Sequence, residues 1–178
     1  MRDRADQDLA ARAAGGCAAA FTALLERHYD RIYRVAWRLL GRQSDAEDIA
    51  QDVCVKLASA IRGWRAEAEF TTWLYRIAYN RALDELRSRQ RVVTLPPSNM
   101  MAMIEAPAES ALDPVEQHEL WKAVRSLPDQ QRDAVLLVYG EDLNHAEAAR
   151  VMACSEKTVS WHLHEARKRL KAMLEPVD

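Results

Sequence analysis

The sequence contains few residues that break helices or link chains covalently. Its 178 residues include only five Gly, six Pro and three Cys. So few Gly and Pro favour long helices over many short strands. Cys17, Cys54 and Cys154 are far apart and odd in number, so they indicate neither a disulfide framework nor a CxxC metal pair. We therefore expect a reducing, cytoplasmic environment.

Long apolar runs are also missing. The longest uninterrupted one is Ala134–Tyr139, whereas a membrane span needs about 20 apolar residues. The first residues, MRDRADQDLAARAAGG, mix Arg with Asp and lack the apolar segment of a signal peptide. The sequence predicts no membrane insertion and no secretion.

Neither sign of charge dominates, but the charges are unevenly distributed. The formal net charge is −2, and that total alone argues against a protein that coats nucleic acid. Residues 92–113 hold three acidic and no basic residues. Residues 76–91 and 143–173 each have a local net charge of +3. The two basic segments are therefore candidates for contact with nucleic acid.

The spacing of apolar residues predicts an all-α fold with two small helical domains joined by a flexible linker. Residues 1–19 are expected to form an N-terminal tail and residues 20–91 a helical domain. Ser44–Glu47 is typical of a capping box at a helix start. Segment 92–113 contains three Pro and no sustained period, which predicts the linker. Residues 114–178 form the second domain, also helical.

The linker is more apolar than a solvated tether. Met100, Met101, Met103 and Ile104 follow one another closely within it. Two interpretations stay open: a loop packed partly on one domain, or a segment that threads through a channel in a partner.

The end of the second domain predicts a helix-turn-helix. Two helices of about 8 and 18 residues are joined by a short turn at 153–155. In the second helix, an apolar stripe from Val159 to Met173 predicts the side that faces the core. Cationic and amphipathic side chains lie on or beside the opposite side, as a helix in the major groove requires. The alternative is an ordinary surface helix with a solvated basic face.

Trp161 falls on the outer side of that helix. A large exposed aromatic residue indicates a surface that something covers. Three coverings stay open: a thymine methyl or sugar edge, a regulator, or the N-terminal domain of the free protein.

A second nucleic-acid signature lies at about 70–91, where a helix is expected to start near Thr71. Phe70, Trp73, Tyr75 and Tyr79 alternate with arginines there. Exposed aromatic rings stack on unpaired bases, while cations follow the backbone. The alternative is a core position for the aromatics and a solvated helix end for the arginines.

Taken in order, three motifs resemble the extracytoplasmic-function (ECF) group of bacterial RNA polymerase sigma factors, in the sigma-70 family. SDAEDIAQDVCVKL (44–57) resembles the helix that docks on the polymerase. FTTWLYRIAYNRALDELRSR (70–89) resembles the helix that melts and reads the −10 element. Residues 127–170 resemble the domain that reads the −35 element. The resemblance implies a DNA-binding initiation subunit with core RNA polymerase, promoter DNA and an anti-sigma factor as partners.

The resemblance also assigns roles to residues. Core-polymerase binding falls to Asp45, Glu47, Asp48, Gln51 and Asp52. Contacts with the −10 element fall to Phe70, Thr72, Trp73, Arg76, Asn80 and Arg87, together with the loop 67–72. Contacts with the −35 element fall to Ser155, Lys157, Thr158, Ser160, Trp161, His164, Arg167 and Lys168.

The last helix departs from the family pattern. Positions 160, 162 and 165 lack the basic residues that are common there, and Trp161 is unusually bulky. Fewer phosphate contacts predict a weaker salt-dependent contribution to DNA binding.

Other functions fit the sequence less well. A sigma-like decoy that sequesters an anti-sigma factor would leave the arginine-rich helix at 70–91 without a role. A plain helix-turn-helix repressor would leave residues 20–91 unexplained. A metal site lacks clustered His or Cys, and no nucleophile, base and orienting group occur together. We therefore expect neither an enzyme nor a cofactor.

Overall fold

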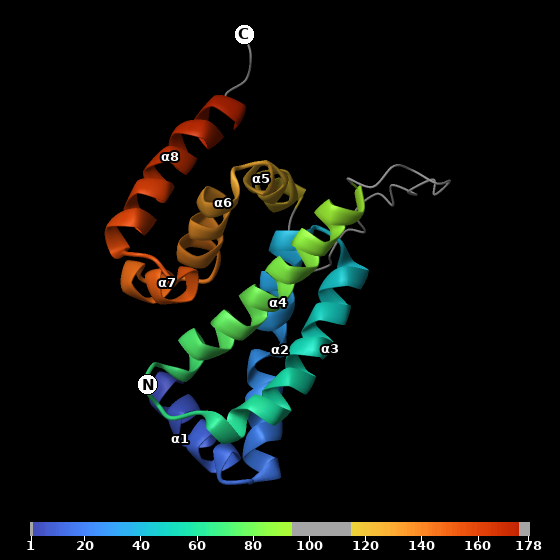
Figure 1. Ribbon diagram of the computed structural model, residues 1–178, viewed down its shortest axis with the longest axis vertical. Coiled ribbons are helices and arrows are strands. Elements are labelled where there is room, and N and C mark those ends of the chain that lie inside the picture. The colour runs from blue at the N-terminus through green and yellow to red at the C-terminus, as the bar shows by residue number, and fades with distance from the viewer. Residues whose placement is uncertain (1, 94–114, 175–178) are drawn as a thin grey trace.

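A computed structural model describes residues 2–93 and 115–174, and within these ranges it contains helices and no strands (Figure 1). The all-α prediction is confirmed. The N-terminal elements are α1 (Arg2–Ala14), α2 (Ala18–Leu40), α3 (Gln43–Ala60), η1 (Ile61–Gly63) and α4 (Phe70–Val93). The C-terminal elements are α5 (Val115–Arg125), α6 (Asp129–Val135), the π-helical η2 (Leu136–Gly140), α7 (His145–Met152) and α8 (Glu156–Leu174). The predicted linker, and with it Met100 to Ile104, lies outside the described residues.

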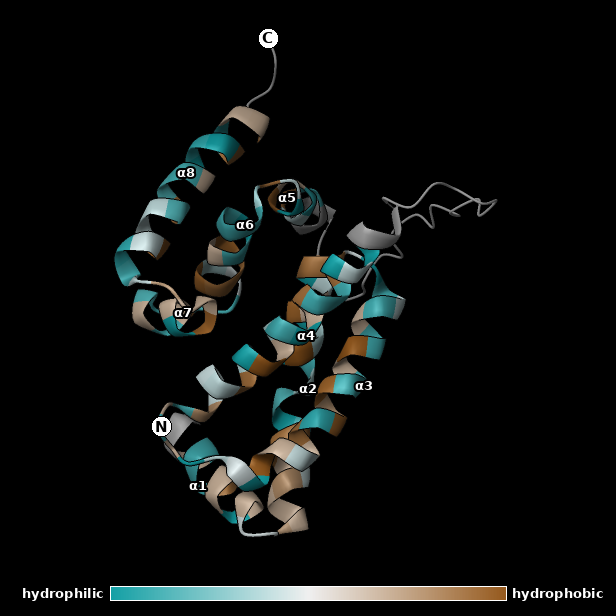
Figure 2. Cartoon of the chain, in the orientation of Figure 1, coloured by the Kyte–Doolittle hydropathy of each residue, from teal (hydrophilic) through white to brown (hydrophobic). Residues whose placement is uncertain are grey.

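The N-terminal domain is built on α2, α3 and α4, which lie alongside one another (Figure 1). Gly41 ends α2 in the left-handed conformation, with φ of 75°, as is common for glycine at a helix C-terminus. Hydrophobic residues gather on the sides where these helices face one another (Figure 2). Among the most fully buried side chains are Ile32, Val35, Trp37, Ile49, Val53 and Leu74.

The segment 1–19, expected as a tail, contains helix α1, which packs on α2, η1 and α4. Ala10 and Ala13 are buried. The carboxylate of Asp6 is also buried; it accepts a hydrogen bond from Arg27, and its Oδ2 lies 3.0 Å from Nε2 of His28. The apolar pattern missed α1 because small alanines and one buried ion pair attach it to the domain.

The predicted capping box at Ser44 is wrong. The N-cap of helix α3 lies two residues earlier, at Arg42, and has no side-chain cap. Instead, Gln43 donates from Nε2 to Oε1 of Glu47 at 2.9 Å, one turn along the same helix.

In the C-terminal domain, α7 and α8 form the predicted helix-turn-helix. A capping box at Asn144 and Glu147 starts α7. Ser155 caps α8 by accepting a hydrogen bond from the backbone N–H of Thr158 at 3.1 Å. The predicted apolar stripe is buried at Val159, Leu163 and Ala166, although it ends before Met173, which is 49% exposed.

The two domains also contact each other. Helix α7 packs against α4, while α5 and η2 pack against α2. Figure 1 shows α7 beside the N-terminal half of α4.

Candidate functional site

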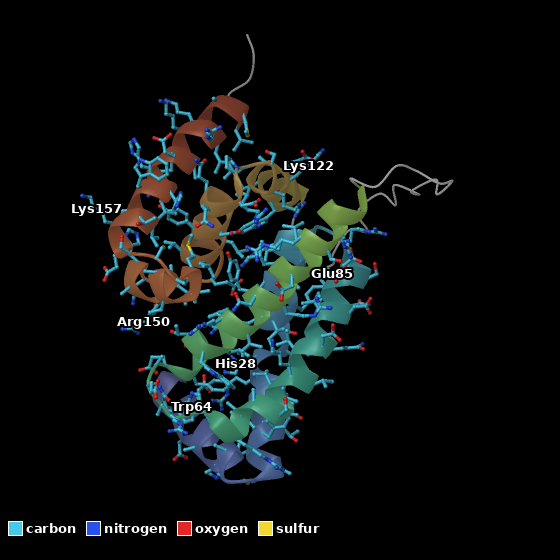
Figure 3. The ribbon with its side chains drawn as sticks, in the orientation of Figure 1. His28, Trp64, Glu85, Lys122, Arg150 and Lys157 are labelled. Carbon is cyan, nitrogen blue, oxygen red and sulfur yellow. The ribbon has the colours of Figure 1, made fainter. Side chains whose placement is uncertain are left out.

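The acidic residues of α3 divide into two groups. Asp45 and Asp52 face α4, where Arg89 donates to Oδ2 of Asp45 at 2.5 Å and Arg81 donates to Oδ2 of Asp52 at 2.7 Å. Glu85 joins both arginines on the same side of α4 (Figure 3). Asp45, whose side chain is 12% exposed, therefore joins α3 to α4, whereas Asp52 pairs with Arg81 at the surface and keeps 53% of its side chain exposed.

The remaining predicted docking residues of α3 are open to solvent. Glu47, Asp48 and Gln51 are exposed, and at 100° per residue they share one side of the helix. Val55 lies on the same side and is 74% exposed, a residue that the sequence reasoning missed. Val55 therefore adds an exposed apolar side chain to a face that is otherwise polar and acidic.

The contact with Arg89 shifts the pKa of Asp45. The hydrogen bond from Arg89 lowers the pKa of Asp45 below its usual value, and this effect outweighs the opposing effect of burial. The same contact raises the pKa of Arg89. Asp45 therefore stays ionised and paired with Arg89 through the neutral range.

The predicted −10 residues of α4 fall into an exposed group and a buried or half-buried group. The side chains of Arg76, Asn80 and Arg87 are exposed, and no ion pair to them is found within the described residues. Phe70 and Thr72 are buried, so their side chains shape the domain from inside. Trp73 is half-buried, with its ring 5.8 Å from that of Phe70.

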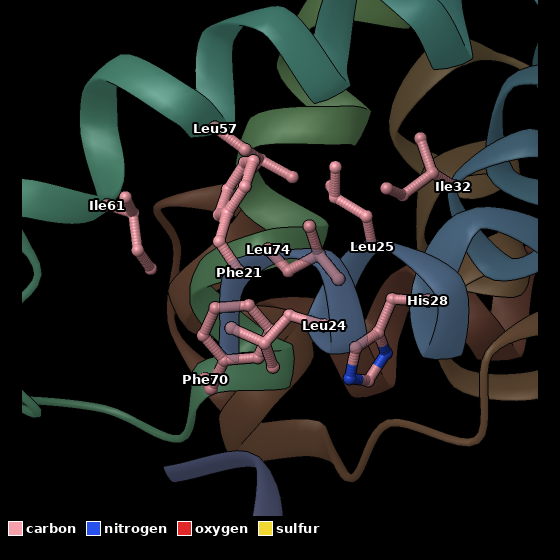
Figure 4. Close-up of a pocket in the computed structure, with 9 residues that line it drawn as sticks. All are labelled: Phe21, Leu24, Leu25, His28, Ile32, Leu57, Ile61, Phe70 and Leu74. Carbon is pink, nitrogen blue, oxygen red and sulfur yellow. The ribbon is translucent and has the colours of Figure 1, made fainter. Parts of the chain in front are cut away.

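A small apolar cavity lies beside Phe70, lined by residues that include Leu24, Leu57 and Leu74, with His28 at its edge (Figure 4). Its volume is about 10 Å³, about the minimum that one water molecule needs. This volume is far below the roughly 300 Å³ at which small-molecule pockets begin, so the cavity is too small for a cofactor or substrate.

The predicted −35 residues lie on or near the outer side of α8. Lys157, Trp161, His164 and Lys168 are exposed, and Figure 3 shows Lys157 pointing away from the bundle. Trp161 is 57% exposed. Of its three expected coverings, packing against the N-terminal domain is therefore not observed.

The other predicted residues have partners in their own domain. The hydroxyl of Ser160 lies 3.0 Å from Nδ1 of His145 on α7. Arg167 donates to the hydroxyl of Tyr139, above whose ring its guanidinium lies at 5.4 Å. The sequence reasoning missed His145 and Tyr139, because this pairing depends on how α7 and η2 pack against α8. It also missed Arg150 and Arg169, two exposed cations that the local charge of this segment already indicated.

Two negative observations hold for residues 2–93 and 115–174. No group of three or more His, Cys, Asp or Glu is arranged to hold a metal ion. No helix is long and apolar enough to cross a membrane.

The geometry defines a two-domain protein that is all-helical over the described residues and contains a helix-turn-helix. The family model Sigma-70 region 2 matches residues 24–92, and the model Sigma-70, region 4 matches residues 117–170. The chain belongs to the ECF group of sigma-70 RNA polymerase sigma factors.

Similar proteins cover nearly the whole chain. The ECF RNA polymerase sigma factor SigM of Mycobacterium tuberculosis (strain H37Rv) is 32% identical over 97% of this chain and 86% of its own. SigW of Bacillus subtilis is 29% identical over 87% of this chain and 89% of its own. Among solved structures, CnrH in complex with the cytosolic domain of CnrY matches with a TM-score of 0.75 and 26% identity, covering 96% of this chain and 97% of that one.

Proposed function

We propose that this sigma factor directs promoter-specific initiation by binding core RNA polymerase through α3, the −10 element through α4 and the −35 element through α8. It would act as a cytoplasmic, DNA-binding subunit without catalytic activity of its own. The observation that carries the proposal is the separation of two exposed surfaces of opposite charge: an acidic face on α3 and a cationic face on α8. Such a division suits a protein with one cationic and one anionic partner surface.

On α3, Glu47, Asp48 and Gln51 form the polymerase-docking face, and Val55 is its apolar anchor. Asp45 and Asp52 act indirectly, because their pairs with Arg89 and Arg81 position α3 on α4.

On α4, Arg76, Asn80 and Arg87 would contact the −10 strand, with Trp73 as the available stacking ring. Phe70 and Thr72 would position the start of α4 and the preceding loop. The aromatic–cation combination suits a strand that has been opened, because stacking accepts any base and cations follow the backbone.

On α8, Lys157, Trp161, His164 and Lys168 would read or hold the −35 duplex. Ser155 and Thr158 fix the start of the helix through their mutual hydrogen bond at 2.8 Å. Helix starts of this kind enter the major groove in helix-turn-helix proteins.

We infer that an anti-sigma factor restrains this chain. CnrH, which has the same fold, was solved in complex with part of another protein. The exposed indole of Trp161 offers such a regulator an apolar contact on the −35 surface.

Reconstituted transcription on genomic fragments tests the proposal. Core polymerase with this chain is expected to initiate at specific start sites, and core polymerase alone is not. If the chain binds core but yields no specific start, it is a decoy that sequesters an anti-sigma factor.

The docking face is tested by Asp48→Ala. We expect about a tenfold loss of affinity for core polymerase in a binding titration, because an exposed charge at the interface is removed. Asp8→Ala, an exposed carboxylate on α1 of the same domain, serves as the control and should bind like the wild type. Equal affinity of Asp48→Ala and Asp8→Ala would remove Asp48 from the docking face.

A further inference from the structure

The loop that leads into α4 is exposed and makes few backbone hydrogen bonds. It consists of residues 64–69, which we call the α4 entry loop, and it includes part of the segment expected to contact the −10 strand. Four of its six residues are exposed. Within the described ranges, no hydrogen bond joins the backbone of residues 65–68 to another backbone group. Ala66 has φ of 56°, a left-handed conformation that a residue other than glycine holds only when its surroundings enforce it. Contacts from outside the loop therefore maintain its shape.

Helix α1 contacts the end of this loop through Gln7. Nε2 of Gln7 donates to Oε2 of Glu69 at 2.6 Å, and the two residues are 62 positions apart in the sequence. The carbonyl of Glu69 accepts a hydrogen bond from the backbone N–H of Trp73 at 3.1 Å, so Glu69 is the N-cap of α4. The contact with Gln7 therefore holds the residue at which the loop becomes a helix.

Asp6, the neighbour of Gln7, anchors α1 to the rest of the domain. Its buried carboxylate accepts a hydrogen bond from Arg27, and its Oδ2 lies 3.0 Å from Nε2 of His28. Both partners belong to α2. A buried carboxylate that is separated from its partners is costly, so α1 keeps its place on α2. This contact therefore also fixes the place of Gln7 relative to the loop.

The start of α4 is held at the same point by a group of rings. The ring of His28 lies 5.5 Å from that of Phe70, the first residue of α4 (Figure 4). Trp64, the first residue of the loop, meets the Phe70 ring edge-on at 6.3 Å, and Trp73 lies 5.8 Å from it. Trp73 is the ring proposed to stack on a −10 base. The anchor of α1, the α4 entry loop and the stacking ring are therefore in contact through Phe70.

We propose that Gln7 is a positioning residue for −10 recognition, through which α1 holds the α4 entry loop in the conformation that meets the DNA strand. The role in recognition rests on the proposed function, whereas the attachment of the loop to α1 does not. A loop that is already held in its binding conformation loses less conformational freedom when it binds. Helix α1 precedes residues 24–92, which match the family model, so the role falls to a part of the chain that this model does not describe.

Limited trypsin digestion of the free chain tests the attachment, with cleavage after Arg65 followed by mass spectrometry. Gln7→Glu removes the donor and places a second carboxylate opposite Glu69. We expect cleavage after Arg65 to become about fivefold faster, which is the effect of one hydrogen bond on the opening of a loop. Gln43→Glu is the matched control, because Gln43 donates to Glu47 in the same way at 2.9 Å on α3. This control should be cleaved after Arg65 at the wild-type rate.

A double variant shows whether the effect belongs to the pair. Gln7→Glu combined with Glu69→Gln restores one donor and one acceptor with their roles reversed, so cleavage after Arg65 should return to the wild-type rate. Two results would overturn the attachment: wild-type cleavage of Gln7→Glu, or a double variant that is cleaved as fast as Gln7→Glu. Because Gln7 lies at the surface of α1, we expect equal helical content by circular dichroism in all of these proteins.

Initiation with core polymerase tests the role in −10 recognition. The readout is the ratio of initiation rates on a promoter and on the same promoter with one −10 base replaced, because a general loss of folded chain lowers both rates alike. We expect Gln7→Glu to lower this ratio several-fold, the double variant to restore it, and Asp8→Ala, an exposed neighbour on α1, to leave it unchanged. An unchanged ratio for Gln7→Glu, in a chain that trypsin cleaves faster, would overturn the positioning role. If the wild type itself does not initiate, the proposed function fails, while the digestion still decides whether α1 holds the loop.

Discussion

Helices α4 and α8 are both long and basic and both were predicted to bind DNA, but their charges are used differently. On α4, Arg81 and Arg89 are paired with carboxylates of α3 and α4. On α8, Lys157 and Lys168 are exposed and have no ion pair among the described residues. The same local net charge of +3 therefore has two meanings. On α4 it includes arginines that pair with carboxylates of the fold, and on α8 it includes cations that are open to solvent. Counting charges along a sequence cannot separate these two uses.

The largest expected effect is a loss of stability when Arg89 on α4 is replaced, which replacing Arg87, two residues earlier, should not cause. Arg89→Ala leaves Asp45, whose side chain is 12% exposed, with only the longer 3.6 Å contact to Arg42. Allowing for the partial exposure of Arg89, we expect a loss of about 1 kcal/mol. In a domain of this size, that loss lowers Tm by about 4–8 °C.

Arg87→Ala is the matched variant, because Arg87 is exposed and has no ion pair in the described part of the chain. We expect an unchanged Tm and slower initiation from a promoter. If both variants unfold at the same temperature, the division of α4 into structural and DNA-facing arginines is wrong.

Apart from the capping box at Ser44, the sequence predicted well what depends on neighbours along one helix. The core stripe from Val159 to Ala166 and the Ser155 cap follow from spacing and from short hydrogen bonds, and both are present. It predicted poorly what depends on packing between helices. The pairs Asp45–Arg89 and Asp52–Arg81 join residues 44 and 29 positions apart, so no local pattern could assign them.

The candidate site shows the same limit. The family resemblance implied that Phe70 and Thr72 contact DNA, but both are buried, and the ring of Phe70 packs against those of His28, Trp64 and Trp73. The sequence could not decide what covers Trp161, because the exposure of this side chain depends on where the N-terminal domain lies.

The free cations of α8 are tested by Lys168→Ala in the full chain bound to core polymerase. If the ammonium neutralises one phosphate, the slope of log affinity against log salt should fall by about 0.9, since each contact releases about that many counterions. Affinity at low salt should fall about threefold, in line with the slope change. Lys122→Ala is the control, since Lys122 is an exposed lysine paired with Glu119 at 3.7 Å on α5. An unchanged slope for Lys168→Ala would place Lys168 outside the phosphate contacts.

The smallest expected effect is a pH dependence specific to the α3–α4 pair. Because the native pKa of Asp45 lies below its unfolded value, its contribution to stability is fully present at neutral pH. That contribution is lost as the pH falls from about 5 through the unfolded and then the native pKa. Equilibrium unfolding followed from pH 7 to pH 3 should show a steeper loss for the wild type than for Asp45→Asn, which has no proton to take up. Glu141 has the opposite sign, because burial raises its pKa and its protonation therefore favours the folded state. Acidification should thus remove the contribution of Asp45 to stability while it relieves the cost of burying the Glu141 charge. Parallel unfolding profiles for the wild type and Asp45→Asn from pH 7 to pH 3 would show that Asp45 adds no pH dependence of its own.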